Sequence, residues 1–130
     1  MLLGEIYEHR ASGGAASFFY HAIKLRNAYV VFITDHESGV PALGNMAITV
    51  PTRLADAPVV SSALPLTNFK YEIIAKSTSE MLGKKLQSAV FLFLDVHFES
   101  TDARFVKDLK VGVDEFCKAI AAKQAQEKKV

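Results

Sequence analysis

Residues 88–96 read SAVFLFLDV and form the most apolar segment of the chain. From Ala89 to Leu94 every side chain is apolar, which predicts a strand with two apolar faces. Residues 29–33 (YVVFI) share this property. Strands of an antiparallel sheet usually alternate apolar and polar residues, because one face is buried and the other is wet. These two segments therefore predict a sheet that needs cover on both faces.

The segment before residues 88–96 is predicted to be a helix over residues 68–83. Phe69, Ile73, Thr78 and Leu82 fall roughly on one face of it. Gly83 is a candidate helix stop, since glycine is common just after a helix end.

The segment after residues 88–96 predicts a second helix, over residues 102–122. Its apolar positions recur at helical spacing and are Phe105, Leu109, Val113, Phe116 and Ile120. Ser100, Thr101 or Asp102 can cap its start. Gly112 lies on the apolar face and has two interpretations: it allows close packing on a sheet, or it is a tolerated weak position that costs about 1 kcal/mol relative to alanine. The polar residues 121–130 are expected to fray.

Further strands are predicted upstream. Their ranges are residues 3–11, 17–25, 28–34, 44–50 and 59–64. In residues 17–25, Phe18 and Tyr20 share one face, and Phe19 and His21 share the other. The short Arg26-Asn27 link predicts a hairpin with the next strand. Five or six strands with two helices predict an α+β fold in a single domain over residues 1–130, an antiparallel sheet with both helices packed on one face.

Two helices on one face leave the other face of the sheet without cover. Curling of the sheet, a loop or another protein can close it, and the apolar runs at residues 29–33 and 89–94 do not decide among these. A protein partner is one expected solution on these grounds alone.

Composition excludes several classes of function. The 130 residues carry 15 basic and 14 acidic side chains, which is no electrostatic footprint for nucleic acid. No apolar run approaches the ~20 residues that cross a bilayer. One cysteine and an N-terminal segment without signal-peptide features favour the cytoplasm, and the nucleus besides.

Residues with metal-binding or acid–base chemistry are few. The sequence has no glycine-rich phosphate loop, no cysteine pair for zinc and no HExxH motif. His9, His21 and His97 suggest a three-histidine metal site or, more simply, strand-edge histidines, and the lack of supporting carboxylate spacing favours the second interpretation. His36 in the segment DHES (residues 35–38) resembles acid–base equipment, but such a polar loop is more typical of a solvated turn.

Two further side chains are candidates with simple structural interpretations. Cys117 is expected to be a buried thiol rather than a nucleophile, because a nucleophile needs an electropositive, partly open setting. Asp95 is expected at a strand end rather than as a buried acid. The sequence therefore predicts no catalytic residue, no cofactor-binding residue and no metal ligand.

Residues 43–64 (LGNMAITVPTRLADAPVVSSAL) and 82–96 (LGKKLQSAVFLFLDV) carry a resemblance to a known family. The order and spacing of Leu43, Asn45, Met46, Ala47, Arg53, Pro58, Val59, Ser61, Ser62, Leu82, Gly83, Lys85, Val90 and Phe91 resemble the eukaryotic proteasome assembly chaperone 4 family. The chain departs from that pattern in the loop of residues 35–40, at Gly44 and at Asp95.

The resemblance implies a six-stranded antiparallel sheet with two helices and a protein that acts by binding. It implies a heterodimer with a chaperone 3-like subunit and transient binding to proteasome α subunits during assembly of the α-ring, with no cofactor and no catalysed reaction. Alone, the chain is expected to be a homodimer or an association-prone monomer. A small dimeric enzyme with an interface active site and an unrelated α+β adaptor are the alternatives.

Overall fold

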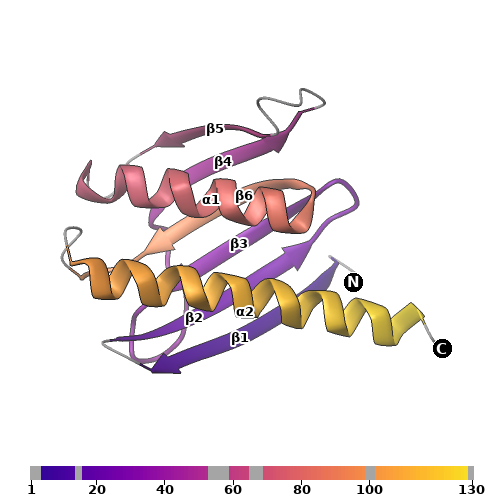
Figure 1. Cartoon of the computed structure of the whole chain (residues 1–130), viewed down its shortest axis with the longest axis horizontal. Coiled ribbons are helices and arrows are strands. Elements are labelled where there is room, and N and C mark those ends of the chain that lie inside the picture. The colour runs from indigo at the N-terminus through magenta and orange to yellow at the C-terminus, as the bar shows by residue number, and fades with distance from the viewer. Residues whose placement is uncertain (1–3, 14–15, 53–58, 65–68, 99–101, 129–130) are drawn as a thin grey trace.

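The computed structural model describes residues 4–13, 16–52, 59–64, 69–98 and 102–128. The elements in chain order are β1 (Glu5–Gly13), β2 (Ala16–Lys24), β3 (Ala28–Thr34), β4 (Asn45–Pro51), β5 (Val59–Leu64), the 3₁₀ turn η1 (Phe69–Tyr71), α1 (Glu72–Leu86), β6 (Ala89–Asp95) and α2 (Ala103–Lys128). Figure 1 shows one sheet crossed by the two helices, which run side by side in the same direction.

The six strands form one sheet in the order β1-β2-β3-β6-β4-β5. β6 therefore lies at the centre, where a strand that is apolar on both faces is expected to lie. The hairpin of β2 and β3 is confirmed, with Tyr20 opposite Ile33 and Ala22 opposite Val31.

The expectation of a wholly antiparallel sheet is wrong at one pair, because β3 and β6 run parallel. A parallel neighbour requires a crossover connection rather than a tight turn. Here the chain from β3 to β6 passes through β4, β5 and α1 before it returns to the centre. All other neighbouring strands are antiparallel, so the predicted α+β class is confirmed for a mixed, mostly antiparallel sheet.

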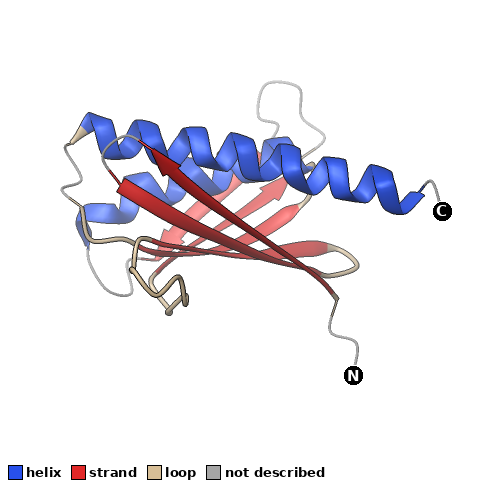
Figure 2. Cartoon of the chain, turned by 90° about the horizontal axis from the view of Figure 1, so that it is seen from below, coloured by secondary structure: helices blue, strands red, loops and turns tan. Residues whose placement is uncertain are grey.

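Both helices pack on one face of the sheet, as predicted (Figure 2). α1 contacts β4, β5 and β6, and α2 contacts β1 and β2. The layer between helices and sheet is the hydrophobic core. Its largest fully buried side chains are Tyr20, Phe18, Phe116, Ile33, Leu82, Leu92, Leu94, Leu109 and Ile120.

Of the two interpretations of Gly112, the structure supports close packing of the helix on the sheet. A Cβ atom at Gly112 would lie 2.1 Å from the Oη atom of Tyr20. Tyr20 is fully buried and donates a hydrogen bond from Oη to the carbonyl oxygen of Leu109, at 2.9 Å. The missing side chain of Gly112 therefore lets α2 lie against this tyrosine of β2.

The boundaries of α1 differ from those predicted. The helix continues past Gly83, which is buried and faces Thr49 of β4. It ends at Leu86, and the capping residue Gln87 has the left-handed conformation. Ile73 was predicted on the apolar face but is 81% exposed, whereas its neighbour Ile74 is buried. Successive residues of a helix are rotated by about 100° around its axis. The predicted apolar residues of this helix were not evenly spaced, so the choice of Ile73 instead of Ile74 for the buried face was wrong.

The polar end of α2 was expected to fray, and this prediction is wrong as far as Lys128. The side chain of Gln124 donates a hydrogen bond to Tyr29 Oη at 2.9 Å, and the Lys123 ammonium lies 5.0 Å from the ring centroid of Tyr7. These polar contacts with β1 and β3 hold a segment that has little apolar surface.

At its N-terminal end, α2 is capped by Asp102, which accepts a hydrogen bond from the Arg104 amide at 3.0 Å. The other two candidate caps, Ser100 and Thr101, lie outside the described residues.

Candidate functional site: the helix-free face of the sheet

The face of the sheet opposite the helices is built from every second residue of the strands. Because successive side chains of a strand point to opposite faces, the neighbours of the core residues must point away from the helices. We call this surface the open face, and its apolar members are Ile6, Ile23, Val30, Phe32, Met46, Ile48, Val50, Leu64, Phe91 and Phe93.

The open face is apolar at its centre and partly exposed. Phe91 of the central strand is 39% exposed, and towards the edges Val50, Leu64 and Ile6 are about half exposed. Phe32 and Phe93 lie opposite each other on β3 and β6, with ring centroids 5.3 Å apart and planes 15° from parallel. The middle of the open face therefore consists of two stacked aromatic rings on neighbouring strands.

A loop covers one end of the open face. Residues 35–44 lie on the side of the sheet away from the helices (Figure 2). A ring nitrogen of His21 is 2.8 Å from the carbonyl oxygen of Gly39, and Gly39 lies against the ring of Phe19. Gly39 has a φ of 73°, a conformation that glycine adopts readily. The loop thus shields Phe19, but it leaves the aromatic centre open and itself exposes Val40 and Leu43.

Charged side chains form a polar rim along the β1 edge of the open face. Glu8 and Arg10 face this side, opposite His21 and Phe19 of β2. A His21 ring nitrogen lies 3.8 Å from Glu8, and the Arg10 guanidinium lies 5.3 Å from the centroid of the Phe19 ring. An apolar centre with a polar rim is the usual anatomy of a protein–protein interface.

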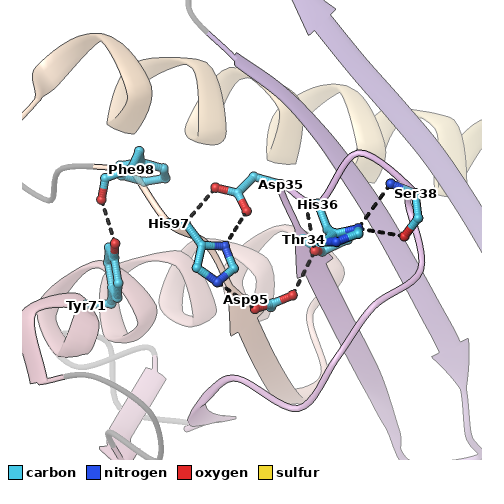
Figure 3. A network of polar contacts seen from close by, with 8 residues as sticks. All are labelled: Thr34, Asp35, His36, Ser38, Tyr71, Asp95, His97 and Phe98. Atoms are coloured by element: carbon cyan, nitrogen blue, oxygen red, sulfur yellow. Dashed lines mark hydrogen bonds and ion pairs between the residues drawn. The ribbon is translucent and has the colours of Figure 1, made fainter.

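A polar network joins the carboxyl ends of β3 and β6 (Figure 3). Asp35 accepts the backbone amide of His97 at 2.7 Å and lies 2.9 Å from its Nδ1 atom. Asp95 accepts the Thr34 hydroxyl at 2.9 Å, and its other oxygen lies 3.6 Å from Nε2 of His97. His97 is therefore held between two carboxylates, one following β3 and one ending β6.

This arrangement favours a charged histidine and a structural role. The hydrogen bond and charge of Asp35 raise the pKa of His97, and the nearby Asp95 charge acts in the same direction, whereas partial burial and Lys70 oppose it. Acid–base activation of a nucleophile needs a free ring nitrogen directed at a hydroxyl or thiol. Both nitrogens of His97 face carboxylates instead, so the network fastens strand ends together.

Asp35 and His36 of the DHES segment (residues 35–38) bond to different partners. Asp35 turns to His97, whereas the ring of His36 bonds the Ser38 hydroxyl at 2.7 Å within its own loop. The expected solvated turn is thus observed for His36. Asp95 lies at a strand end, as predicted.

The remaining candidate residues lie apart from one another. His9 is 3.4 Å from Glu115 of α2 on the helix side, His21 is on the open face, and His97 is in the network. Among the described residues no group of histidine, cysteine and carboxylate side chains could hold a metal ion. Cys117 is buried, and burial raises the pKa of its thiol to about 11, which keeps it protonated near neutral pH.

Sequence reasoning missed the contact between Asp35 and His97. The contact results from the pairing of β3 with β6, which puts Thr34 directly opposite Asp95 and so brings the residues that follow each strand together. Because these strands are far apart in the chain, no local sequence signal indicates the contact. The open face, by contrast, was foreseen from the two apolar segments. No helix in the described parts of the chain is long and apolar enough to cross a membrane.

Comparison with known proteins finds a likeness in fold. No protein-family model matches the chain, and no curated protein matches its sequence. A chain in the crystal structure of a novel chaperone complex for yeast 20S proteasome assembly superposes with a TM-score of 0.60 and 10% identity, over 97% of this chain and 98% of that one. The fold therefore resembles that of a proteasome assembly chaperone. Membership of the chaperone 4 family stays a prediction.

Proposed function

We propose that this chain is a subunit of a proteasome assembly chaperone, and that it pairs through its open face with a related chaperone 3-like subunit. The observation that carries the proposal is the partly exposed aromatic centre of a sheet whose fold resembles an assembly chaperone. Monomeric proteins rarely leave so continuous an apolar surface in water. A partner sheet laid on Phe91, Phe93 and Ile48 would bury it.

The proposed activity is binding without chemistry. The dimer binds proteasome α subunits and, by covering a surface used in wrong contacts, favours the correct neighbours in the α-ring through differential affinity. It leaves when later subunits take the same surface. This function uses no cofactor and no catalytic residue, and it places the protein in the cytoplasm and the nucleus. In the absence of its partner, the chain pairs with itself.

Charge substitution on the open face tests the pairing. Phe91→Glu and Ile48→Glu should abolish association in sedimentation velocity while the far-UV spectrum stays native, since a carboxylate in the middle of an apolar interface is desolvated without a partner. Ile73→Glu is the matched control, because Ile73 is 81% exposed on α1, away from the open face. A wild-type chain that stays monomeric at all concentrations, alone and with the chaperone 3-like subunit, contradicts the proposed interface.

The proteasome assignment needs its own measurement. The reconstituted heterodimer should bind free α subunits in sedimentation experiments and should bury about 1,600 Å² at a standard-sized dimer interface. A stable dimer that binds none of the α subunits would refute the chaperone function while leaving the interface intact. That result would favour the unrelated adaptor.

A further inference from the structure

We propose that the groove between α1 and α2 is a second docking surface, which binds an acidic segment with apolar side chains from another protein. The helices α1 and α2 lie on the opposite side of the sheet from the open face (Figure 2), so the inference does not depend on the dimer interface. The groove has a volume of about 560 Å³ and is lined by Met81, Ala103, Val106, Lys107, Lys110, Val111 and Asp114.

The groove exists because α2 carries two apolar stripes. One stripe, with Leu109, Val113 and Phe116, is buried against the sheet. The other runs through Ala103, Val106 and Val111 and faces the groove. A helix on a globular core needs only the first stripe. Val106 packs partly against the core, whereas Val111 is 49% exposed, so the core does not account for the outer part of the second stripe.

The charges that line the groove favour a negatively charged segment. Asp114, the acidic residue lining the groove, is already held by Lys85 at 2.6 Å and Lys118 at 3.0 Å, and both lysines lower its pKa. Lys107 and Lys110 have no ion-pair partner among the described residues. The groove therefore offers free positive charge and no free negative charge.

Two further carboxylates of the helices, Glu115 and Glu80, are bound to residues other than these lysines. Glu115 of α2 turns to His9 of β1, on the other flank of the helix. Glu80 of α1 accepts a hydrogen bond from Ser61 of β5. Glu115 and Glu80 are thus engaged away from the residues that line the groove, and Lys107 and Lys110 border its apolar side chains.

The occupant that fits is an amphipathic segment, helical in its bound form. Its apolar side chains would pack on Met81, Val106 and Val111, as helices do in apolar grooves. Its carboxylates would lie beside Lys107 and Lys110. A basic segment would meet uncompensated like charge, which selects against it.

Two synthetic peptides test the inference, one with leucine and glutamate on opposite helical faces and a twin with lysine for glutamate. Titration into isotope-labelled protein should shift the NMR signals of Met81, Val106 and Val111 with the glutamate peptide only. The double variant Lys107→Glu/Lys110→Glu should bind this peptide roughly tenfold more weakly or less well still, and should now bind the lysine peptide. Val111→Ser should weaken binding without reversing the preference.

The control is Arg26→Glu/Lys76→Glu, which changes net charge equally at two exposed residues that do not line the groove. It should bind the glutamate peptide as the wild type does. Three results overturn the inference: shifts confined to open-face residues such as Val30 and Phe91, equal affinity for both peptides, or equal loss of affinity in the two double variants.

Discussion

Gly112 is the residue on which the seating of α2 most directly depends. Gly112→Ala should lower the free energy of unfolding by about 1–3 kcal/mol in urea denaturation, because the added methyl overpacks the site of the Tyr20 ring. Val111→Ala, at the neighbouring exposed position, should change stability by less than about 0.5 kcal/mol. In a Tyr20→Phe background the cost of Gly112→Ala should shrink, since the nearest clashing atom is gone. An unchanged cost there would place the strain at the ring atoms Cζ and Cε2, which lie 2.6 and 2.9 Å from the added Cβ.

His97 should make stability depend on pH. Its pKa is raised above 6.5 in the folded protein, so its contribution is fully present below about pH 6.5 and is lost as pH rises through the folded pKa. His97→Gln should therefore destabilise the protein more at pH 5.5 than at pH 8.5. The loss should stay below about 1 kcal/mol, because the side chain is 69% exposed and its ion pairs are screened.

An NMR titration gives the direct measurement. Asp35→Asn should lower the pKa of His97, since it removes the largest cause of the shift. A His97 pKa at or below 6.5 in the wild type would contradict the polar network that holds His97 between Asp35 and Asp95.

At the scale of the element, α1 is fixed to the sheet by a buried pair of hydroxyls. Ser79 donates to the carbonyl oxygen of Lys76 at 2.9 Å, so Thr49 of β4 donates to Ser79, at 2.7 Å. Ser79→Ala should cost about 1–3 kcal/mol in unfolding free energy, because it leaves the Thr49 hydroxyl buried without an acceptor. In Thr49→Val/Ser79→Ala both hydroxyls are gone, so the double variant should be more stable than the sum of single effects predicts.

Thr78 offers a built-in control for that cycle. Its hydroxyl is buried on the same helix and has no hydrogen-bond partner among the described residues. Thr78→Val should leave stability unchanged or raise it, since no hydrogen bond is lost. For the pair Thr49→Val and Ser79→Ala, strictly additive losses of unfolding free energy would show that the contact between the two hydroxyls does not stabilise α1.

The sequence predicted those elements whose evidence is local. The buried stripe of α2 recurs at helical spacing, and Phe18 and Tyr20 alternate with Phe19 and His21, so type and face were both correct. The parallel pairing of β3 with β6 was not predicted, because it joins segments far apart in the chain and no turn signals it. The Asp35–His97 contact depends on that pairing and was missed with it.

At the scale of the whole molecule, association should make thermal stability depend on concentration. If folded chains pair through the open face, a tenfold rise in protein concentration should raise Tm by about 2–4 °C, because dimerisation stabilises the folded state by mass action. Phe91→Glu should remove the dependence, and Ile73→Glu should retain it. A wild-type Tm that is independent of concentration across the range where sedimentation finds a dimer would contradict this linkage.

The central position of β6 also governs when the open face is formed during synthesis. β1, β2 and β3 form one hairpin-linked group and β4 with β5 another, and in the finished sheet only β6 joins them. During synthesis both groups leave the ribosome before β6 does, each with an unpaired edge at β3 or β4. The open face spans both groups, so it exists as one surface only after the chain has been made through Asp95. A growing chain thus lacks the proposed interaction surface until β6 has joined the sheet, which delays the proposed pairing until synthesis has passed Asp95.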